Sequence, residues 1–228
     1  MYFISAPFGN YLKFKNTISV TGSWTVQPRP GLYKQIAKTL RYTKTGWRNK
    51  IGLRNKGILH AVTQHSHNDI ISLAAIDKND WYTFESFIPS DASVEINISC
   101  PNLDKQVDQL LPGFNIFNSS KREWCIAKTS PTADEKLVDK LVESGYSTIH
   151  ASNTLQTAKG GLSGKVLVPY TMKIITYIKQ THPHVQVIAG GGVTCKQDAQ
   201  DYINAGADHI SIGSVCFTPW KIKGIVND

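Results

Sequence analysis

The stretch Asn97-Ile98-Ser99-Cys100-Pro101-Asn102 follows a run, Val94 to Ile98, that has the apolar character of a buried strand. It therefore lies where a strand ends and a loop begins. A thiol, two amides and a hydroxyl gather there beside a proline, which suits a binding or catalytic loop. The same residues also suit an ordinary turn with a core cysteine and turn-forming asparagines. The stretch alone leaves both interpretations open, and the rest of the chain decides between them.

Other predicted strands also end in residues that suit a ligand. In a barrel of parallel strands, the carboxyl ends of all strands lie on one face, where such sites are found. Convergence of several polar or glycine-rich strand ends therefore favours one shared site. These ends are Lys128 after a strand from Cys125, Ser152-Asn153-Thr154 after Ser147–Ala151, Gly190-Gly191-Gly192 after Val185–Ala189, and Gly213-Ser214 after His209–Ile212.

Strands and helices alternate along the chain, with about eight strand candidates. This spacing predicts an α/β fold, a compact TIM (β/α)8 barrel forming one domain over residues 1–228. Only about a dozen residues separate the strands Tyr2–Ala6 and Ile18–Thr21, and about a dozen follow the last strand, so the first and last helices are expected to be shortened.

The other predicted elements are strands at 70–76 and 94–98, and helices at 33–42, 58–65, 80–87, 132–144, within 165–181, and at 197–205. Asp80 is the predicted N-cap of its helix. Thr132 and Glu135 form a predicted capping box. The polar stretches 49–57 and 160–164 are predicted to be loops.

Composition limits the class of protein. Hydrophobic residues make up 41% of the 228 residues and charged residues 18%, which is a globular balance. No apolar run is long enough for a membrane span, and the N-terminus lacks a signal-peptide pattern. The four cysteines form no CxxC pair, which favours free thiols in the cytoplasm. Most of the net charge of +8 is interpreted as non-specific solvated charge, because no zinc-finger or aromatic RNA-binding pattern accompanies it to indicate nucleic acid. A small anionic ligand would be attracted by the same positive field.

Several single residues suggest chemistry, each with an ordinary alternative. Lys128 lies in an apolar strand, so it needs either an internal ion pair or a cofactor contact. Cys100 is a candidate nucleophile or base, although no catalytic triad accompanies it. Gly-Gly and Gly-Ser at two late strand ends suit a phosphate, or simply end strands. His60, His65 and His67 suit a solvated helix end better than a metal site, so no metal is predicted.

Taken together, these motifs resemble the dihydroorotate dehydrogenases, flavin enzymes of pyrimidine biosynthesis. The resemblance runs in order through most of the chain and rests on seven motifs. They are Asn49-Lys50-Ile51-Gly52-Leu53-Arg54-Asn55, Asn97-Ile98-Ser99-Cys100-Pro101-Asn102, Ala127-Lys128, Asn153-Thr154, Gly160-Gly161-Leu162-Ser163-Gly164, Gly191-Gly192-Val193 and Gly213-Ser214.

The resemblance implies oxidation of dihydroorotate to orotate in an FMN-containing barrel, an activity of the EC 1.3 type. Cys100 aligns with the base that removes the C5 proton while hydride moves from C6 to flavin N5. A cysteine there is similar to the soluble class. Lys128 maps beside the N1/O2 edge of the flavin, where it favours the reduced anion. The implied substrate contacts are Asn49, Ile51, Gly52, Leu53, Asn97, Asn102, Asn153 and Thr154, and the implied cofactor contacts are Asn97, Lys128, Gly164, Gly191, Gly192, Gly213 and Ser214.

The chain also departs from the family. Gly22 stands where the soluble class has a lysine close to flavin and substrate, and the chain is shorter than typical members. These departures keep two alternatives open: a related FMN barrel acting on another small molecule, and a degenerate flavin-binding or partner-binding scaffold. The resemblance implies a homodimer, whose partner subunit covers apolar surface left by the lost helices. The electron acceptor stays open among fumarate, a nicotinamide-linked partner and a quinone.

Overall fold

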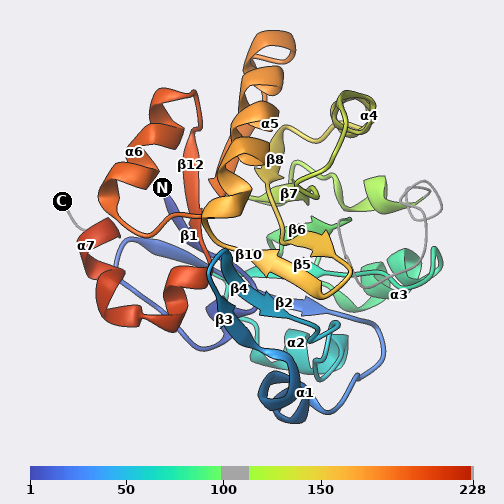
Figure 1. The fold of residues 1–228 in the computed structure, drawn as a ribbon. Coiled ribbons are helices and arrows are strands. Elements are labelled where there is room, and N and C mark those ends of the chain that lie inside the picture. The colour runs from blue at the N-terminus through green and yellow to red at the C-terminus, as the bar shows by residue number, and fades with distance from the viewer. Residues whose placement is uncertain (99–112, 227–228) are drawn as a thin grey trace.

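The computed structural model of this protein describes residues 1–98 and 113–226. Its strands close into a parallel barrel (Figure 1), which confirms the predicted fold class. Sequence neighbours pair around most of the barrel, and the first strand closes it by pairing with the last. The order is β1 (Tyr2–Ile4), β12 (His209–Ile212), β11 (Gln186–Gly190), β8 (Thr148–Ala151), β7 (Cys125–Lys128), β6 (Val94–Asn97), β5 (Ile70–Leu73) and β2 (Thr17–Trp24).

The strands alternate between two apolar clusters, because successive side chains of a strand point to opposite faces. Phe3 of β1 belongs to a small cluster with Ile126 and Ile188, whereas its neighbour Ile4 belongs to the large cluster that includes the helices. The same change occurs between Ile70 and its neighbour on β5. The small cluster fills the barrel interior, and the large one joins the barrel to its helical shell.

The helices that follow the strands are of unequal length. The covering helices are α2 (Ile58–Gln64), α3 (Asp80–Phe87), α4 (Glu135–Glu143), α5 (Val168–Thr181) and α6 (Lys196–Asn204). Between β1 and β2 only a 3-10 turn, η1 (Phe8–Asn10), is present. After β12 come the 3-10 turns η5 (Ser214–Phe217) and η6 (Pro219–Lys221) and the short helix α7 (Lys223–Val226). The expected shortening of the first and last helices is therefore confirmed.

A second, four-stranded antiparallel sheet was not expected from the sequence. Its order is β3 (Arg41–Thr43), β4 (Gly46–Asn49), β10 (Gly160–Ser163) and β9 (Leu155–Thr157), and α1 (Leu32–Thr39) precedes it. The predicted loop at 160–164 and the helix end at residue 42 are therefore wrong. The reason is a long-range pairing of Gly161 with Asn49, which no local pattern reports. Gly160 permits it, since a Cβ there would lie 2.4 Å from the Asn49 carbonyl oxygen.

Two helix starts also differ from expectation. Asn79 precedes α3, and Asp80 is its first helical residue, whose Oδ2 accepts a hydrogen bond from the Ile76 N–H at 2.7 Å. Asp134 caps α4 by accepting from the Leu137 N–H at 2.9 Å, so the predicted Thr132 capping box is wrong. A carboxylate directly before the first helical residue is a better acceptor for these free N–H groups than a hydroxyl two residues earlier.

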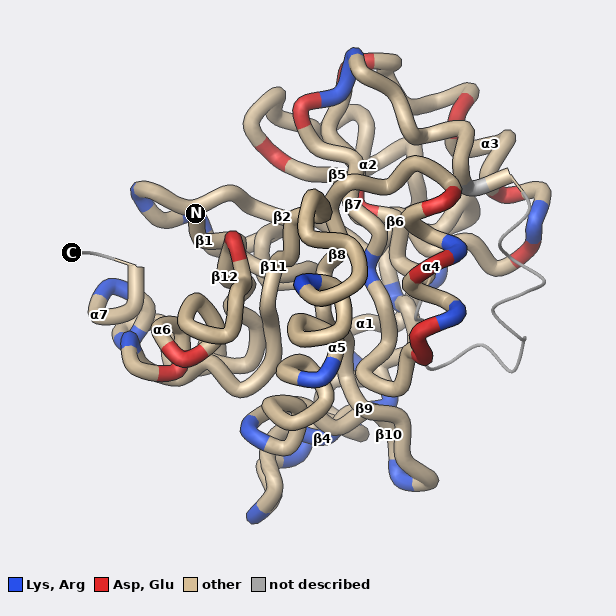
Figure 2. Tube along the Cα trace, turned by 90° about the horizontal axis from the view of Figure 1, so that it is seen from above, with Lys and Arg blue, Asp and Glu red and all other residues tan. Residues whose placement is uncertain are grey.

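Charge is unevenly distributed over the fold. No Asp or Glu occurs before Asp69, or between Glu143 and Asp198. The strands β3 and β4 come from the first of these acid-free segments, and β9 and β10 come from the second. Figure 2 shows basic residues around β4, β9 and β10. The second sheet therefore carries a positive surface. Within the described residues, no helix is both long and apolar enough to cross a membrane.

We predict that Gly9→Ala destabilises the fold, because η1 packs directly on β2. A Cβ on Gly9 would lie 2.3 Å from the Val20 carbonyl oxygen and 2.6 Å from its nitrogen, so backbone must move. The expected loss in free energy of unfolding is about 1–3 kcal/mol, the usual cost of overpacking. Urea denaturation measures it.

Gly224→Ala is the matched control, since it adds the same methyl group where no atom lies within 4 Å. Its stability should be unchanged or higher by about 0.5–1 kcal/mol, because alanine favours the helix. Equal stability of the two variants would show that η1 does not pack as described.

Candidate active site

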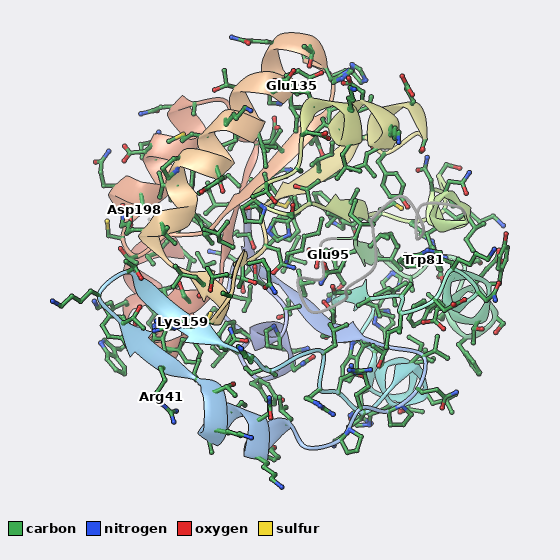
Figure 3. All side chains as sticks on the ribbon, turned by 45° about the vertical axis from the view of Figure 1, so that its right-hand side comes forward. Arg41, Trp81, Glu95, Glu135, Lys159 and Asp198 are labelled. Carbon is green, nitrogen blue, oxygen red and sulfur yellow. The ribbon has the colours of Figure 1, made fainter. Side chains whose placement is uncertain are left out.

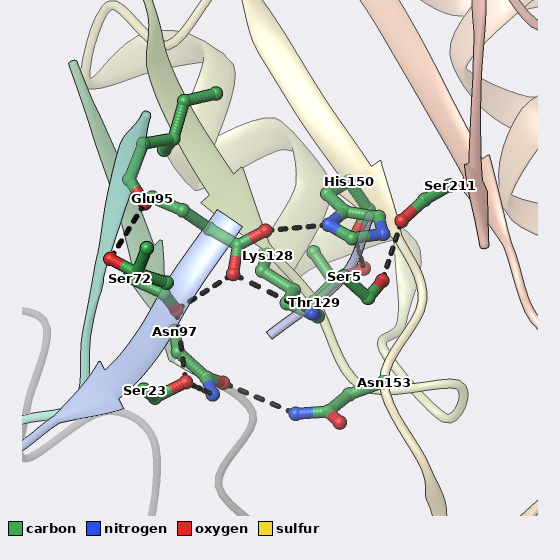
Figure 4. Close-up of polar contacts among 12 residues, drawn as sticks. Ser5, Ser23, Ser72, Glu95, Asn97, Lys128, Thr129, His150, Asn153 and Ser211 are labelled. Atoms are coloured by element: carbon green, nitrogen blue, oxygen red, sulfur yellow. Dashed lines mark hydrogen bonds and ion pairs between the residues drawn. The ribbon is translucent and has the colours of Figure 1, made fainter. Parts of the chain in front are cut away.

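The ends of three neighbouring strands bring predicted site residues together. Asn97 on β6 lies in register with Lys128 on β7, and Lys128 lies in register with His150 on β8. Asn153 follows β8 and donates from Nδ2 to Asn97 Oδ1 at 3.2 Å. Asn97 in turn donates from Nδ2 to Ser23 Oγ at 2.8 Å (Figure 4). Two amides and a lysine thus meet at the carboxyl end of the barrel.

The second sheet carries another predicted group to the same place. Asn49, at the end of β4, pairs in register with Gly161. A Cβ on Gly161 would lie 2.8 Å from Thr154 Oγ1, so the missing side chain lets the sheet approach the loop after β8. The Asn153 side chain holds this loop, since its Oδ1 accepts from the Thr154 N–H at 2.8 Å. Asn49 and Thr154 therefore lie near each other although a hundred residues separate them.

The loop after β4 has an unusual backbone. Ile51 donates its N–H to Asn49 Oδ1 at 3.2 Å, which turns the chain directly after the strand. Gly52 and Leu53 both have positive φ angles, 68° and 52°. Leucine rarely adopts this conformation, and such residues concentrate at ligand sites. The loop is thus shaped for exposing backbone groups rather than for packing side chains.

The predicted phosphate residues lie in loops that follow β10, β11 and β12. Gly164, Gly191 and Gly192 all have positive φ, at 120°, 94° and 77°. A Cβ on Gly192 would lie 3.2 Å from the Gly164 carbonyl oxygen, so the first two loops touch. Gly213 precedes Ser214, the first residue of η5, and only Ser5 lies within 4 Å of a Cβ built there. Side-chain-free backbone at several strand ends fits a phosphate group.

A buried charged network lies below these groups. Glu95 Oε2 accepts a hydrogen bond from His150 Nδ1 at 2.6 Å, and Oε1 lies 3.5 Å from Lys128 Nζ. Ser72 donates to the same Oε1 at 2.7 Å. Glu95 is fully buried, and Figure 3 shows it at the centre of the barrel. The ion pair for Lys128, one of the two readings of its position, is therefore present.

The network determines the protonation of its members. Burial alone would raise the pKa of Glu95, but Lys128 and His150 outweigh it and hold that pKa below its usual range. Burial, followed by the Lys128 charge, lowers the pKa of His150, and Glu95 opposes this only in part. At neutral pH the network therefore consists of a carboxylate, an ammonium and a neutral imidazole.

Sequence reasoning missed Glu95 and His150 as site residues. Both occupy inward positions of strands whose outward neighbours are apolar, such as Ile96 and Ile149. Ser5 and Ser211, with Oγ atoms 2.6 Å apart, occupy equivalent positions on β1 and β12. A polar residue between two apolar ones in a buried strand was the available signal, but it becomes informative only once the strands close into a barrel.

Two predicted site residues, Cys100 and Asn102, lie outside the described residues. The histidine-rich segment lies apart from the network: the His60 ring packs against Trp24, with ring centroids 5.8 Å apart. Across residues 1–98 and 113–226, no three His, Cys, Asp or Glu side chains gather closely enough to hold a metal ion.

We predict that Lys128→Met strongly destabilises the protein, because it leaves Glu95 as a buried carboxylate without its cation. Losing one partner of a buried pair costs about 3–5 kcal/mol. The double variant Glu95→Gln/Lys128→Met removes both charges and should recover part of the loss. Urea denaturation of the single and double variants measures this, and equal stability of Lys128→Met and wild type would exclude a stabilising pair.

The pH dependence of stability follows from the same network. Glu95 and His150 both have lowered pKa values in the folded state, so the unfolded chain binds more protons in acid. Their contribution is complete above the unfolded pKa of histidine, about 6.5, and is lost as the pH falls through the folded values. Glu95 accounts for the part of this loss between its unfolded pKa of 4.5 and its folded pKa of about 2, so the Glu95→Gln variant should show a shallower loss of stability between pH 5 and pH 2 than wild type.

Comparisons with known proteins agree with this geometry. The sequence model of the dihydroorotate dehydrogenase family matches residues 135–227. The catalytic subunit of dihydroorotate dehydrogenase B (NAD(+)) from Thermotoga petrophila is 28% identical over 254 residues, covering 98% of this chain and 91% of the relative. The corresponding subunit from Endomicrobium trichonymphae is 28% identical over 227 residues, covering 86% of this chain and 72% of the relative.

Solved structures support the fold. Two structures of the dihydroorotate dehydrogenase from Eimeria tenella superpose with TM-scores of 0.71 for the ligand-free form and 0.75 for the complex with ferulenol. Each covers 92% of this chain, and this chain covers 75% and 73% of them, at 19% and 18% identity. The matches extend over the barrel from end to end, and what this chain is similar to, in sequence and in fold, is the dihydroorotate dehydrogenases.

Proposed function

We propose that this protein oxidises dihydroorotate to orotate with FMN, as an oxidoreductase of the EC 1.3 type in pyrimidine biosynthesis. The observation that supports this most is the meeting of Asn97, Lys128 and Asn153 at one end of a barrel whose late strands end in glycine loops. In that arrangement, the amides and the lysine suit a planar ring, and the glycine loops suit a phosphate at a separate place. We further propose one FMN-binding domain over residues 1–228.

The residues present fit FMN. The glycine loops, with Gly164 beside Gly192, offer backbone N–H groups to the phosphate and ribityl chain, together with Gly191, Gly213 and Ser214. Lys128 is a cation buried at the end of its strand, and its ammonium has three donors, of which Glu95 Oε1 takes one at a long 3.5 Å. When bound, FMN supplies the acceptor for the hydride that leaves C6 of the substrate.

The chain's own residues bind and orient the substrate. Asn97 and Asn153 are connected amides whose donors and acceptors suit the alternating N–H and C=O edge of a pyrimidine ring. Asn49 and Thr154 lie beside them, and Asn102 belongs to the same proposed set. The backbone at Ile51, Gly52 and Leu53 binds the carboxylate. The basic second sheet, with Arg41 and Lys159 at its rim (Figure 3), attracts this anion.

Cys100 is the proposed base that takes the C5 proton. In the sequence it stands three residues after Asn97, the last residue of β6, and it lies outside the described residues. A thiol accepts a proton efficiently only when its pKa is matched to the working pH.

A second candidate is oxidation of a different small molecule by the same FMN barrel, and Gly22 favours it. A Cβ on Gly22 would lie 2.6 Å from the Ser72 carbonyl oxygen, and its φ is 105°, so this backbone does not accept the lysine of the soluble class. The substrate charge must then be met elsewhere, and Lys50 and Arg54 on the loop after β4 are the candidates to meet it.

The proposal predicts a yellow protein whose flavin band bleaches when L-dihydroorotate is added without oxygen. Cys100→Ala should keep the flavin but slow bleaching by about 10²–10⁴-fold, the usual contribution of a general base. Stopped-flow absorbance measures the rate. Asp139→Asn, which changes a surface carboxylate paired with His182, is the control and should bleach at the wild-type rate.

Each other outcome selects an alternative. A flavin band that L-dihydroorotate does not bleach leaves the cofactor and favours another substrate. A protein that binds no FMN on reconstitution refutes the cofactor, and the barrel is then a scaffold without turnover.

We propose that the protein acts in the cytoplasm as a homodimer. Large aromatic side chains are exposed on the barrel's shortened side and on the second sheet, including Trp220 at 74% and Tyr42 at 74%. A second copy covering them would remove apolar surface from water. Sedimentation equilibrium at micromolar concentration should give twice the 25.3 kDa chain mass, and Trp220→Lys should lower it. A wild-type monomer would refute the dimer.

A further inference from the structure

Four consecutive barrel strands contribute to the network around Glu95, and its connections are ordered. Oε2 faces His150 Nδ1 on β8, and Oε1 faces Ser72 on β5 and Lys128 on β7. The carboxylate is therefore held on both oxygens, and its orientation is fixed across the barrel. Figure 4 shows His150 and Lys128 on one side of it and Ser72 on the other.

Barrel stability alone does not explain this network. The neighbouring part of the interior is filled by Phe3, Ile126 and Ile188, which shows that apolar side chains fit there. Buried ion pairs are often no more stabilising than apolar replacements. Buried charged groups of this kind cluster at functional sites, where they adjust the charge of other groups.

The contacts of Lys128 point the same way. Its ammonium reaches Glu95 at 3.5 Å, long for a charged hydrogen bond, and its side chain is 5% exposed. A buried ammonium is unfavourable unless an anion stays nearby. Glu95 is the described carboxylate that does this, and His150 is the group that holds the second oxygen of Glu95 in place.

Among the described residues, the remaining surroundings contain no competing charge. Ser72 on β5, Ser5 directly after β1 and Ser211 on β12 contribute hydroxyls, and β11 contributes Gly190. Glu95 is influenced by Lys128 and by the imidazole of His150, and His150 is influenced by Lys128 and Glu95. With His150 neutral, the network carries no net charge, although its cation faces the site.

His150 has a defined tautomer as a result. Because a carboxylate only accepts, Nδ1 carries the proton toward Glu95, which leaves Nε2 bare, buried and without a partner among the described residues. A Cβ on Gly190 would lie 3.1 Å from this nitrogen, so the glycine makes room for the ring. The ring nitrogen that binds Glu95 is therefore Nδ1 of His150.

We propose that Glu95 and His150 are positioning residues: Glu95 holds the Lys128 ammonium toward the proposed flavin site, and His150 fixes the Glu95 carboxylate toward Lys128. This rests on the proposed function, because it assigns Lys128 to the flavin. The network thereby makes reduction of the bound flavin easier, since reduced FMN carries a negative charge that an ammonium stabilises.

Glu95→Gln tests the first half of the proposal with a side chain of the same shape. Without its anion, the Lys128 ammonium is no longer held toward the flavin site, and the equilibrium ratio of reduced to oxidised FMN against a reference dye should fall about tenfold. For a two-electron couple this is about 30 mV. A merely structural defect would lower the stability or the content of bound FMN and leave this ratio unchanged.

His150→Asn and His150→Gln test the second half as a matched pair. Asparagine keeps an amide donor at the δ position and should retain the wild-type ratio. Glutamine moves its donor to the ε position, releases the Glu95 oxygen and should lower the ratio toward that of Glu95→Gln. Equal ratios for the two variants would overturn the role of His150.

Asp208→Asn is the control for loss of a carboxylate paired with lysine, because Asp208 binds Lys179 at 2.7 Å and lies before β12, at the opposite end of the barrel. Its flavin ratio should equal that of wild type. The proposal for Glu95 is overturned if Glu95→Gln also keeps the wild-type ratio.

The same experiment separates this inference from the proposed function. The dye equilibrium needs no dihydroorotate, so it still decides the matter if the substrate is wrong. If wild type binds no FMN, side-chain NMR of the Lys128 Nζ, assigned with Lys128→Met, replaces it. A chemical shift of this nitrogen that changes in Glu95→Gln but not in Asp208→Asn supports the role of Glu95, and an unchanged shift overturns it.

Discussion

The Glu95 carboxylate, held by Lys128 and His150 inside the barrel, is the interaction on which the site depends. Carrying a lysine into an apolar interior is unfavourable unless an anion accompanies it, and the anion must itself be hydrogen-bonded. Strands β5 to β8 supply these groups in consecutive order. The barrel therefore positions one positive charge at its carboxyl end without carrying net charge in its core.

The rest of the site is arranged around this centre with little regular structure. Asn97 and Asn153 bond to each other above the network, and Asn97 also bonds to Ser23 at the end of β2. The second sheet adds Asn49 from the first half of the chain and the glycines of β10 from the second half. Glycine is required here because side chains would separate the sheet from the loop after β8. The groups of the proposed site thus come from strand ends and the loops that follow them, and the barrel supplies their spacing.

The first and last helices of the barrel are shortened, and local packing replaces them. The first barrel helix is replaced by η1, which lies so close to β2 that Gly9 has no room for a Cβ. The last helix is reduced to α7 and two 3-10 turns. Trp47 of β4 packs on Phe217 of η5 with ring centroids 4.3 Å apart, which ties the second sheet to the shortened end of the barrel. The strand ends therefore stay connected through such contacts even where the covering helices are short.

The sequence by itself determined the barrel, the strand ends that face the site, and the residue types of a flavin enzyme. Alternation of apolar strands with amphipathic helices is a local signal, as is a glycine or asparagine at a strand end, so both can be read along the chain. Only the tertiary structure decided the partner of Lys128, the roles of Ser72 and His150, and the pairing of β4 with β10. Those contacts join residues 23 to 116 positions apart, and a local pattern cannot say which inward side chains will meet once eight strands close.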